Sequence, residues 1–353
     1  MNVPELSLCI INHNGERYLP QTLWAVDVIR DLFREVLLVD NASTDASLEI
    51  AQRDFPEVRI LPRETNDGPG AARNLGFRSA TRDLILFIDN DVILDPDCPA
   101  RLLEALQTRP DATFAMARVL FDEDRDRIQF DGASAHFLGM MAVDCGPPPG
   151  VPGDGIRDIE SLISACFLVD RRRWTTDLFD EALFIYQEDH ELALRARLSG
   201  HRILFVPRAR CYHREGTVGL SLRQTGGRYT SVRVINNIRN RWYLILKLYQ
   251  WRTIFLFSPA FLLFEIFQFL GVVKKGWIGE WVRACFWLGR RLPEIARRRR
   301  EFARRRRYPD RIVMQAGPIP FHQQMARGNV ERAGVAMLNG IARANWKAAR
   351  IVA

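Results

Sequence analysis

The sequence lacks cysteine patterns that would form a disulfide framework or hold zinc. No two of its six cysteines form a Cys-x-x-Cys pair: Cys9, Cys98, Cys145, Cys166, Cys211 and Cys285. This spacing favours reduced core thiols in a cytosolic protein. A secretory signal peptide is not expected either, because Pro4 and Glu5 interrupt any apolar stretch near the N-terminus. We therefore expect the body of the protein to lie on the cytosolic side.

Acidic residues are scarce in the last third of the chain. Residues 1–232 hold 26 Lys and Arg against 36 Asp and Glu, a net charge of −10, whereas residues 233–353 hold 24 against 6, a net charge of +18. The formal net charge of +8 therefore combines an acidic body, long enough to bury a substantial core, with a strongly basic tail. Nucleic acid is not the expected partner, since no aromatic-rich RNA motif accompanies the arginines, and anionic lipid fits the tail better.

Strands and helices alternate over the first part of the sequence. Short apolar runs, which are typical of buried strands, follow helical stretches with turn residues between them. This order predicts an α/β fold with a mostly parallel sheet flanked by helices, of the kind that binds nucleotides. The expected strands are 6–12, 35–40, 58–61, 84–89, 112–121, 163–169 and 202–206, the last closed by Pro207. The expected helices are 18–32, 41–50, 71–80 and 189–198, and a loop is expected over 145–155, which contains the triple proline 147–149.

The tripeptide Asp89-Asn90-Asp91 follows the apolar run 84–88. Because side chains alternate along a strand, its two carboxylates face the same way. At the carboxyl end of a parallel strand they occupy the position where open α/β sheets bind ligands. Carboxylate oxygens, together with those of a diphosphate, are ligands that Mg²⁺ and Mn²⁺ accept. The alternative is an acidic turn that only ends the strand.

Two other segments stand next to predicted strands. Asp40 closes the second strand, where a carboxylate can accept hydrogen bonds from a nucleobase edge; the alternative is an N-cap for the helix that follows. The segment 66–74 reads Asn-Asp-Gly-Pro-Gly-Ala-Ala-Arg-Asn. Its glycine-rich backbone before a helix favours phosphate, and Arg73 adds a forked cationic donor. Asp67 and Gly68 belong to this candidate phosphate loop.

Glu188-Asp189 and His213 complete the candidate site. An acid at a helix start, downstream of a metal site, can serve as a general base. The alternative is compensation of the helix dipole at an N-terminus. The imidazole of His213 is a common ligand for transition metals, although a single histidine is often only structural.

The C-terminal part of the sequence predicts an association with membrane. Residues 253–273 are apolar apart from Glu265 and the neutral polar Thr253, Ser258 and Gln268, and their number is near the ~20 residues that a bilayer span requires. Trp and Tyr flank this segment like an interfacial belt, and the arginine runs 297–300 and 304–307 follow it. We expect a C-terminal α-helical, membrane-associated extension on the cytoplasmic face of the inner membrane, either as a span or hairpin or as amphipathic helices in the interface. The alternative is a soluble helix packed on the body. The predicted domains are 1–232 for the α/β body, 233–307 for the membrane-associated helices and 308–353 for a C-terminal tail.

Together and in this order, the five elements of the candidate site resemble the family 2 inverting glycosyltransferases of the GT-A fold. The resemblance runs from about Leu6 to Tyr243 and is nearest to the bacterial branch that builds cell-envelope polysaccharides, described as rhamnosyltransferase-like. Residues 235–249 also resemble the stretch that opens the C-terminal helices in that branch. Processive synthases of the superfamily carry Gln-x-x-Arg-Trp, but here Ile238 replaces the Gln and only Arg241-Trp242 remains. We therefore expect non-processive transfer.

The resemblance implies a nucleotide-diphosphate sugar as donor (UDP-, dTDP- or GDP-linked), a divalent metal ion (Mn²⁺ or Mg²⁺) and a hydroxyl of a lipid-linked or saccharide acceptor. It implies that Asp189 deprotonates the acceptor, with Glu188 as the other candidate base. Asp91 and His213 would ligate the metal, and Asp89 would join them while it orients the ribose and sugar. The implied donor-binding residues are Asn12, Asp40, Asp67, Gly68, Arg73, Asp89 and Asn90.

Two other classes of protein share some of these features. A nucleotidyltransferase has a similar sheet and carboxylate-bound metal, but it would have no use for a base at Asp189. It would also carry a glycine-rich signature near the N-terminus, which the stretch 10–15 (Ile-Ile-Asn-His-Asn-Gly) does not supply. A membrane-bound scaffold that has lost activity would not be expected to keep all the candidate carboxylates.

Overall fold

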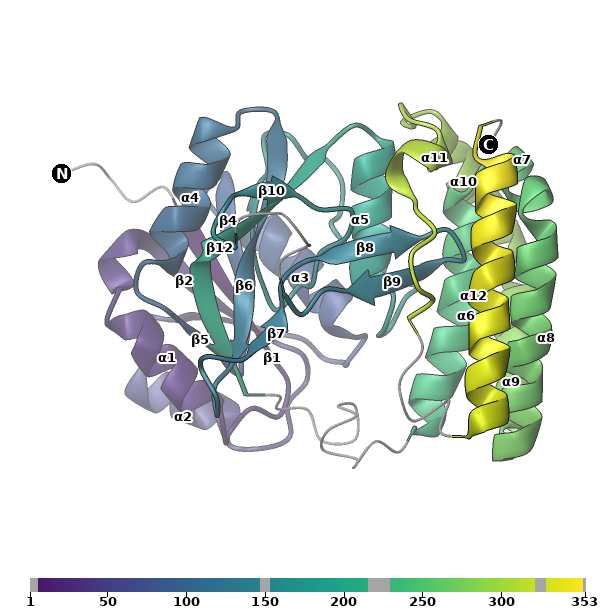
Figure 1. Cartoon of the computed structure of the whole chain (residues 1–353). Helices are drawn as coiled ribbons and strands as arrows, with labels where there is room; N and C mark the ends of the chain where they lie inside the picture. Colours follow the sequence, from purple (N-terminus) through teal and green to yellow (C-terminus); the bar gives the residue numbers. More distant parts are fainter. Residues whose placement is uncertain (1–5, 147–152, 215–228, 321–327, 352–353) are drawn as a thin grey trace.

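The computed structural model describes residues 6–146, 153–214, 229–320 and 328–351. The triple proline 147–149 of the predicted loop lies outside these residues. A mixed sheet crosses the body in the order β10-β12-β6-β11-β4-β1-β2-β3, with β5 added to β12 and β7 to β6 (Figure 1). Its strands are β1 (Leu6–Asn12), β2 (Phe33–Asp40), β3 (Arg59–Pro62), β4 (Leu84–Asp89), β5 (Val92–Leu94), β6 (Ala112–Phe121), β7 (Ile128–Phe130), β10 (Arg157–Asp158), β11 (Cys166–Asp170) and β12 (Arg202–His213).

The N-terminal half of the sheet is parallel, as predicted. Strand β1 pairs in parallel with both β2 and β4, so the ends of these three strands meet at one edge. Strand β11 then runs antiparallel to both β4 and β6, and β12 is again parallel to β6. The fold is therefore an α/β fold with a mixed sheet. A separate hairpin is formed by β8 (Ala133–His136) and β9 (Met140–Val143).

Helices flank the sheet of the body. Gly76 brings one of them, α3, close to β1, because a Cβ at this position would lie 2.1 Å from the Cys9 Sγ. The predicted helix 18–32 is shorter in the structure: α1 ends at Asp27 and a single 3-10 turn (Arg30–Leu32) follows. The helices of the body are α1 (Leu19–Asp27), α2 (Ser47–Asp54), α3 (Pro69–Ser79), α4 (Cys98–Thr108) and α5 (Glu188–Leu198).

The prediction that Pro207 closes a strand is wrong. Strand β12 continues to His213, and its register against β6 shifts between Val206 and Arg210. Proline lacks the N–H that a regular ladder needs, so it is tolerated inside this irregular stretch. The continuation matters because it carries His213 beside Val92, its partner in β5.

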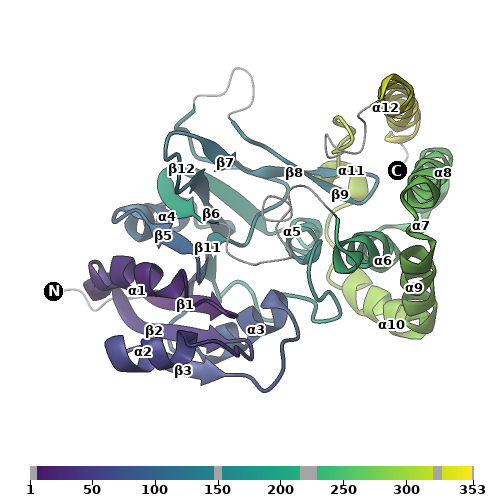
Figure 2. The same cartoon turned by 90° about the horizontal axis from the view of Figure 1, so that it is seen from below.

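The C-terminal helices form a layer against one side of the body (Figure 2). Buried side chains of α5 and of the β8–β9 hairpin share one apolar core with this layer, for example Leu194, Phe137, Leu248 and Phe261. The predicted boundary at residue 232 therefore falls in the first turn of a helix that packs on the body. The helices are α6 (Ser231–Leu248), α7 (Trp251–Leu256), α8 (Ser258–Lys275), α9 (Ile278–Arg290), α10 (Leu292–Ala303), α11 (Asp310–Val313) and α12 (Asn329–Ala349).

The apolar segment 253–273 is divided between two helices. Pro259 lies in the first turn of α8, where its missing N–H costs nothing, rather than kinking one long helix. Glu265 forms an ion pair with the buried Arg241. Among the described residues, no helix combines the length and the apolar character needed to cross a bilayer.

Several arginines of the basic tail form contacts within the fold. Arg298 pairs with Asp180 at 2.8 Å, Arg299 donates to the Leu246 carbonyl at 2.6 Å, and Arg306 pairs with Asp310. These contacts join α10 and the segment after it to the body and to α6. The sequence-based assignment of both arginine runs to lipid is therefore too broad.

Candidate active site

The candidate site lies where β1, β2 and β4 end. Asn12, the last residue of β1, is fully buried and donates to Asp40 Oδ1 at 2.7 Å. Its Oδ1 accepts from Asn90 Nδ2 at 2.7 Å. Asn12 thus ties the end of β2 to the turn after β4. The structure does bring together Asn12, Asp40 and Asn90, while their contact with a donor stays a prediction.

Asp40 organises the loop that follows it. Its carboxylate is only 1% exposed and accepts hydrogen bonds from the backbone N–H of Ser43 at 2.9 Å and from its hydroxyl at 2.5 Å. Ala42 adopts a left-handed conformation (φ +58°) between them. Both oxygens of the Asp40 carboxylate already accept hydrogen bonds from Asn12 or Ser43, so a nucleobase would have to share them. The contact between Asp40 and a nucleobase stays a prediction.

The candidate phosphate loop leads into α3. Gly68 has φ +94°, and a Cβ there would meet the Phe184 carbonyl oxygen at 1.9 Å, so only glycine fits. Asp67 is exposed and accepts from Arg63 at 2.7 Å. Arg73 lies one turn inside α3, almost fully buried, with two of its nitrogens unpaired among the described residues.

Arg73 connects the phosphate loop to the carboxylates. It forms an ion pair with Asp89 and donates to the Ser164 carbonyl at 3.2 Å. The backbone N–H of Ser164 in turn donates to Asp189 Oδ2 at 3.3 Å. The residues that the sequence assigned to donor, metal and base are therefore neighbours in one site.

Asp89, Asp91 and His213 form a possible metal centre. One ligand atom from each lies within 4.8 Å of the others. His213 Nε2 is 3.3 Å from Asp91 Oδ2, and its Nδ1 is 3.0 Å from Gln129 Oε1. If Nδ1 carries the proton and donates to Gln129, Nε2 is the nitrogen left for a cation. Two carboxylates and an imidazole are a donor set that fits Mn²⁺ or Mg²⁺.

The pKa of Asp89 reflects this environment. Burial raises it to about 6, and the negative charge of Asp91 acts in the same direction, while Arg73 opposes both. Carboxylates that are costly to ionise together become easier to ionise beside a cation. The pair is therefore suited to a bound positive charge.

Glu188 and Asp189 begin α5 after a strained turn. Tyr186 and Gln187 both have left-handed backbones (φ +65° and +69°), which is unusual for two consecutive non-glycine residues. Asn240 of α6, fully buried, holds the turn by donating to the carbonyls of Ile185 at 3.0 Å and Tyr186 at 2.7 Å. Strain of this kind at a helix start is common at functional sites.

Burial shifts the pKa values of both acids. Burial, with a further contribution from Asp189, raises the pKa of Glu188 to about 8, and burial also raises the pKa of Asp189. Near neutral pH Glu188 therefore holds its proton for most of the time, which makes it the poorer candidate for a general base. One oxygen of each carboxylate is buried without a partner among the described residues. This arrangement favours Asp189 as the base.

The shifted pKa of Glu188 has a consequence for stability. Between its ordinary value of 4.5 and about 8, the folded state keeps a proton that the unfolded state releases, so stability falls as pH rises through this window. Glu188→Gln removes the penalty. We expect the variant to match wild type near pH 4.5 and to exceed it near pH 8 by at least ~1 kcal/mol in free energy of unfolding. Urea unfolding in EDTA at both pH values checks this, with the exposed Glu301→Gln as control.

Asn240 gives a second prediction. Asn240→Ala leaves two buried carbonyls without their donor, so we expect a loss of about 1–3 kcal/mol in stability. Turnover should fall more than donor affinity, because the turn positions Glu188 and Asp189. Asn236→Ala is the matched control: its side chain is equally buried on α6, but its Nδ2 donates to its own helix at Val232 O. Equal effects of the two variants on turnover would contradict a positioning role for Asn240.

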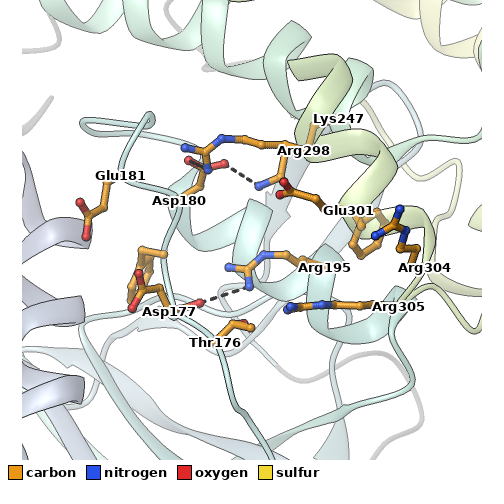
Figure 3. A pocket seen from close by; sticks show the side chains of 12 residues that line it. Thr176, Asp177, Asp180, Glu181, Arg195, Lys247, Arg298, Glu301, Arg304 and Arg305 are labelled. Carbon is orange, nitrogen blue, oxygen red and sulfur yellow. Dashed lines mark hydrogen bonds and ion pairs between the residues drawn. The ribbon is translucent and has the colours of Figure 1, made fainter. Parts of the chain in front are cut away.

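A cavity of about 520 Å³ is lined by residues of α5, α6, α10 and the segment 176–181, and Figure 3 shows the side chains that line it. Lys247 reaches Asp180 at 2.5 Å and Glu191 at 2.6 Å, and Arg298 reaches Asp180 from α10. Lys247 and Arg298 hold the pKa of Asp180 well below its usual range despite burial. Charges of both signs line the cavity, and their pairing ties α6 and α10 to the helix that carries Asp189.

Several of these contacts could not be found from the sequence. Gln129, Ser164 and Asn240 act on His213, Asp189 and the turn before Glu188 from elements far away in the chain. Spacing gives no signal for such pairs.

Comparisons with known proteins agree with the fold. Succinoglycan biosynthesis protein ExoO of Rhizobium meliloti is 28% identical over 231 residues, 63% of this chain and 64% of that protein. The chain covers less than two thirds of the length of the curated relatives ExoO and two uncharacterised glycosyltransferases.

Two solved structures are similar in fold. S. aureus TarS 1-349 in complex with UDP-GlcNAc has a TM-score of 0.53 at 14% identity, covering 98% of this chain and 92% of that chain. GalNAc-T7 with UDP, GalNAc and Mn²⁺ has a TM-score of 0.56 at 18% identity, covering 74% and 50%. Residues 7–148 match the family model described as glycosyl transferase family 2, so this part of the chain carries the domain of a glycosyltransferase.

Proposed function

We propose that the protein is a metal-dependent, inverting glycosyltransferase that moves a sugar from a nucleotide-diphosphate donor to an acceptor hydroxyl. The observation that carries the proposal is the grouping of Asp89, Asp91 and His213 within 4.8 Å. Arg73 and Ser164 connect this group to Asp189. A cation site and a general base close to each other are what a single displacement at an anomeric carbon requires.

Each residue has a distinct task in this proposal. Asp89, Asp91 and His213 would hold Mn²⁺ or Mg²⁺, which when bound neutralises the charge on the departing diphosphate. Arg73 keeps Asp89 in place and offers its unpaired nitrogens toward the donor. Asp189 accepts the proton of the acceptor hydroxyl as that oxygen attacks the anomeric carbon from the face opposite the leaving group. One displacement of this kind inverts the configuration.

For the donor we propose a UDP-linked sugar ahead of dTDP- or GDP-linked sugars. Support comes from the similar structures, which are complexes of TarS with UDP-GlcNAc and of GalNAc-T7 with UDP, GalNAc and Mn²⁺. For the acceptor we propose a saccharide, free or lipid-linked, in the synthesis of a bacterial envelope polysaccharide, within the rhamnosyltransferase-like branch. The name of ExoO, a succinoglycan biosynthesis protein, supports the polysaccharide. Ile238 in place of the Gln of processive synthases supports a single transfer.

Thermal unfolding with nucleoside diphosphates tests the donor site without knowledge of the sugar. We expect UDP and Mn²⁺ together to raise the melting temperature more than the sum of their separate effects, because the diphosphate completes the coordination of the cation. UMP with Mn²⁺ is the control, since it lacks the second phosphate. No shift with UDP, dTDP or GDP in the presence of Mn²⁺ would contradict the proposal.

A further inference from the structure

We propose that the outer side of α8 and α9 binds the surface of an anionic lipid bilayer, with these helices lying flat in the interface. The proposal is independent of the proposed catalysis and concerns the surface formed by residues 258–290. In Figures 1 and 2, α8 and α9 lie on the side of the helical layer that faces away from the sheet, and α6 lies between them and the body.

Helix α8 exposes a continuous apolar stripe. At 3.6 residues per turn its five exposed large apolar positions fall within about 100° of one another. Their exposed fractions run from 40% at Phe269 to 64% at Leu262. The stripe consists of Leu262, Ile266, Phe269, Leu270 and Val273. Single exposed apolar residues need no explanation, but a stripe along a whole helix indicates a surface that another apolar phase covers.

Helix α9 extends the apolar surface. Ile278, Val282 and Phe286 are 49%, 52% and 64% exposed and share one face of the helix. Cys285 and Gly289 lie on the same face by helical spacing, and both line an apolar cavity of about 290 Å³ between α6, α8 and α9. This cavity offers room for part of an acyl chain beside the stripe.

The charges on these helices select an anionic bilayer over a second copy of the chain. Arg283 and Arg290 fall on the flanks of the α9 stripe, where long cationic side chains can reach lipid headgroups. The two acids of α8 and α9 are already engaged, Glu265 with Arg241 and Glu280 with the Ser231 hydroxyl. A symmetric dimer through this surface would bring like charges together, whereas anionic lipids attract them.

Co-sedimentation of the full-length protein with vesicles tests the proposal, and no donor or acceptor is needed. We expect binding to phosphatidylcholine vesicles that contain phosphatidylglycerol, and at least tenfold weaker partitioning for Leu270→Glu/Phe286→Glu. The matched control is Trp24→Glu/Val28→Glu, which makes the same change at two exposed apolar residues, one in α1 and one directly after it, on the far side of the body. It should bind like wild type. Arg283→Glu/Arg290→Glu should lose most of the preference for anionic over neutral vesicles.

Three results would overturn the proposal. The first is wild type that stays in the supernatant with anionic vesicles. The second is equal loss of binding in the α8–α9 and α1 variants. The third is a concentration-dependent dimer, measured by light scattering, that Leu270→Glu/Phe286→Glu abolishes without any change in vesicle binding. Far-UV circular dichroism and the UDP–Mn²⁺ thermal shift of each variant exclude misfolding, and they report on the proposed function separately.

Discussion

Asp91→Ala is expected to abolish metal-dependent transfer while the protein stays folded. The variant removes one of two carboxylates that face His213 and leaves a donor set too poor to hold a divalent cation firmly. We expect nucleoside diphosphate release to fall at least ~10³-fold, the order of effect for a lost charge-stabilising group at a reacting centre. Mn²⁺ binding, followed by electron paramagnetic resonance, should weaken in parallel.

The control for this variant is Asp97→Ala. Asp97 lies six residues further along, is exposed, and pairs only with Arg101 on the surface among the described residues. It should leave both activity and Mn²⁺ binding unchanged. Full activity of Asp91→Ala with Mn²⁺ would remove the metal-site interpretation, whatever the behaviour of the control.

Asp189→Asn is expected to cause the second large loss of activity. Asparagine keeps the size and the hydrogen bond from the Ser164 N–H but cannot accept a proton, so we expect turnover to fall by about 10²–10⁴-fold. Donor KM should change little, because the acceptor rather than the donor loses its partner. Initial rates at several donor concentrations separate these two quantities.

Glu188→Gln is the companion of this variant. Because burial keeps Glu188 protonated near neutral pH, its neutral amide analogue should lose much less turnover than Asp189→Asn. The opposite order would make Glu188 the base. A collapse of donor affinity in Asp189→Asn with normal residual turnover would make Asp189 a binding residue.

The N-terminal half of the fold could be predicted because its strands are buried on both faces. Runs such as 84–88 have to be apolar throughout, and parallel pairing brings their ends to one edge. Asp40 and Asp89 could be placed at the site for this reason. The predicted strand ended before Pro207 and left His213 outside the sheet. The expectation that His213 lies next to Asp91 therefore rested on the family resemblance and not on a local sequence pattern.

The C-terminal helices show where the sequence misleads. An apolar run flanked by aromatics suits a bilayer span, but it also suits two helices that bury one face against a body. At the division, Phe257 packs against Phe137 and Trp346 in the shared core, and Glu265 pairs with Arg241 of α6. Contacts of this kind join elements that are distant in the sequence, so the sequence pattern alone does not predict them.

The most direct test of the account is the release of nucleoside diphosphate from a panel of nucleotide sugars, measured with Mn²⁺ and with EDTA. We predict slow hydrolysis of at least one donor by wild type with Mn²⁺, with UDP-linked sugars first, loss of this activity in EDTA and its recovery when Mn²⁺ is restored. Release that persists unchanged in EDTA, or release of pyrophosphate rather than nucleoside diphosphate, would contradict a metal-dependent glycosyltransferase at this site.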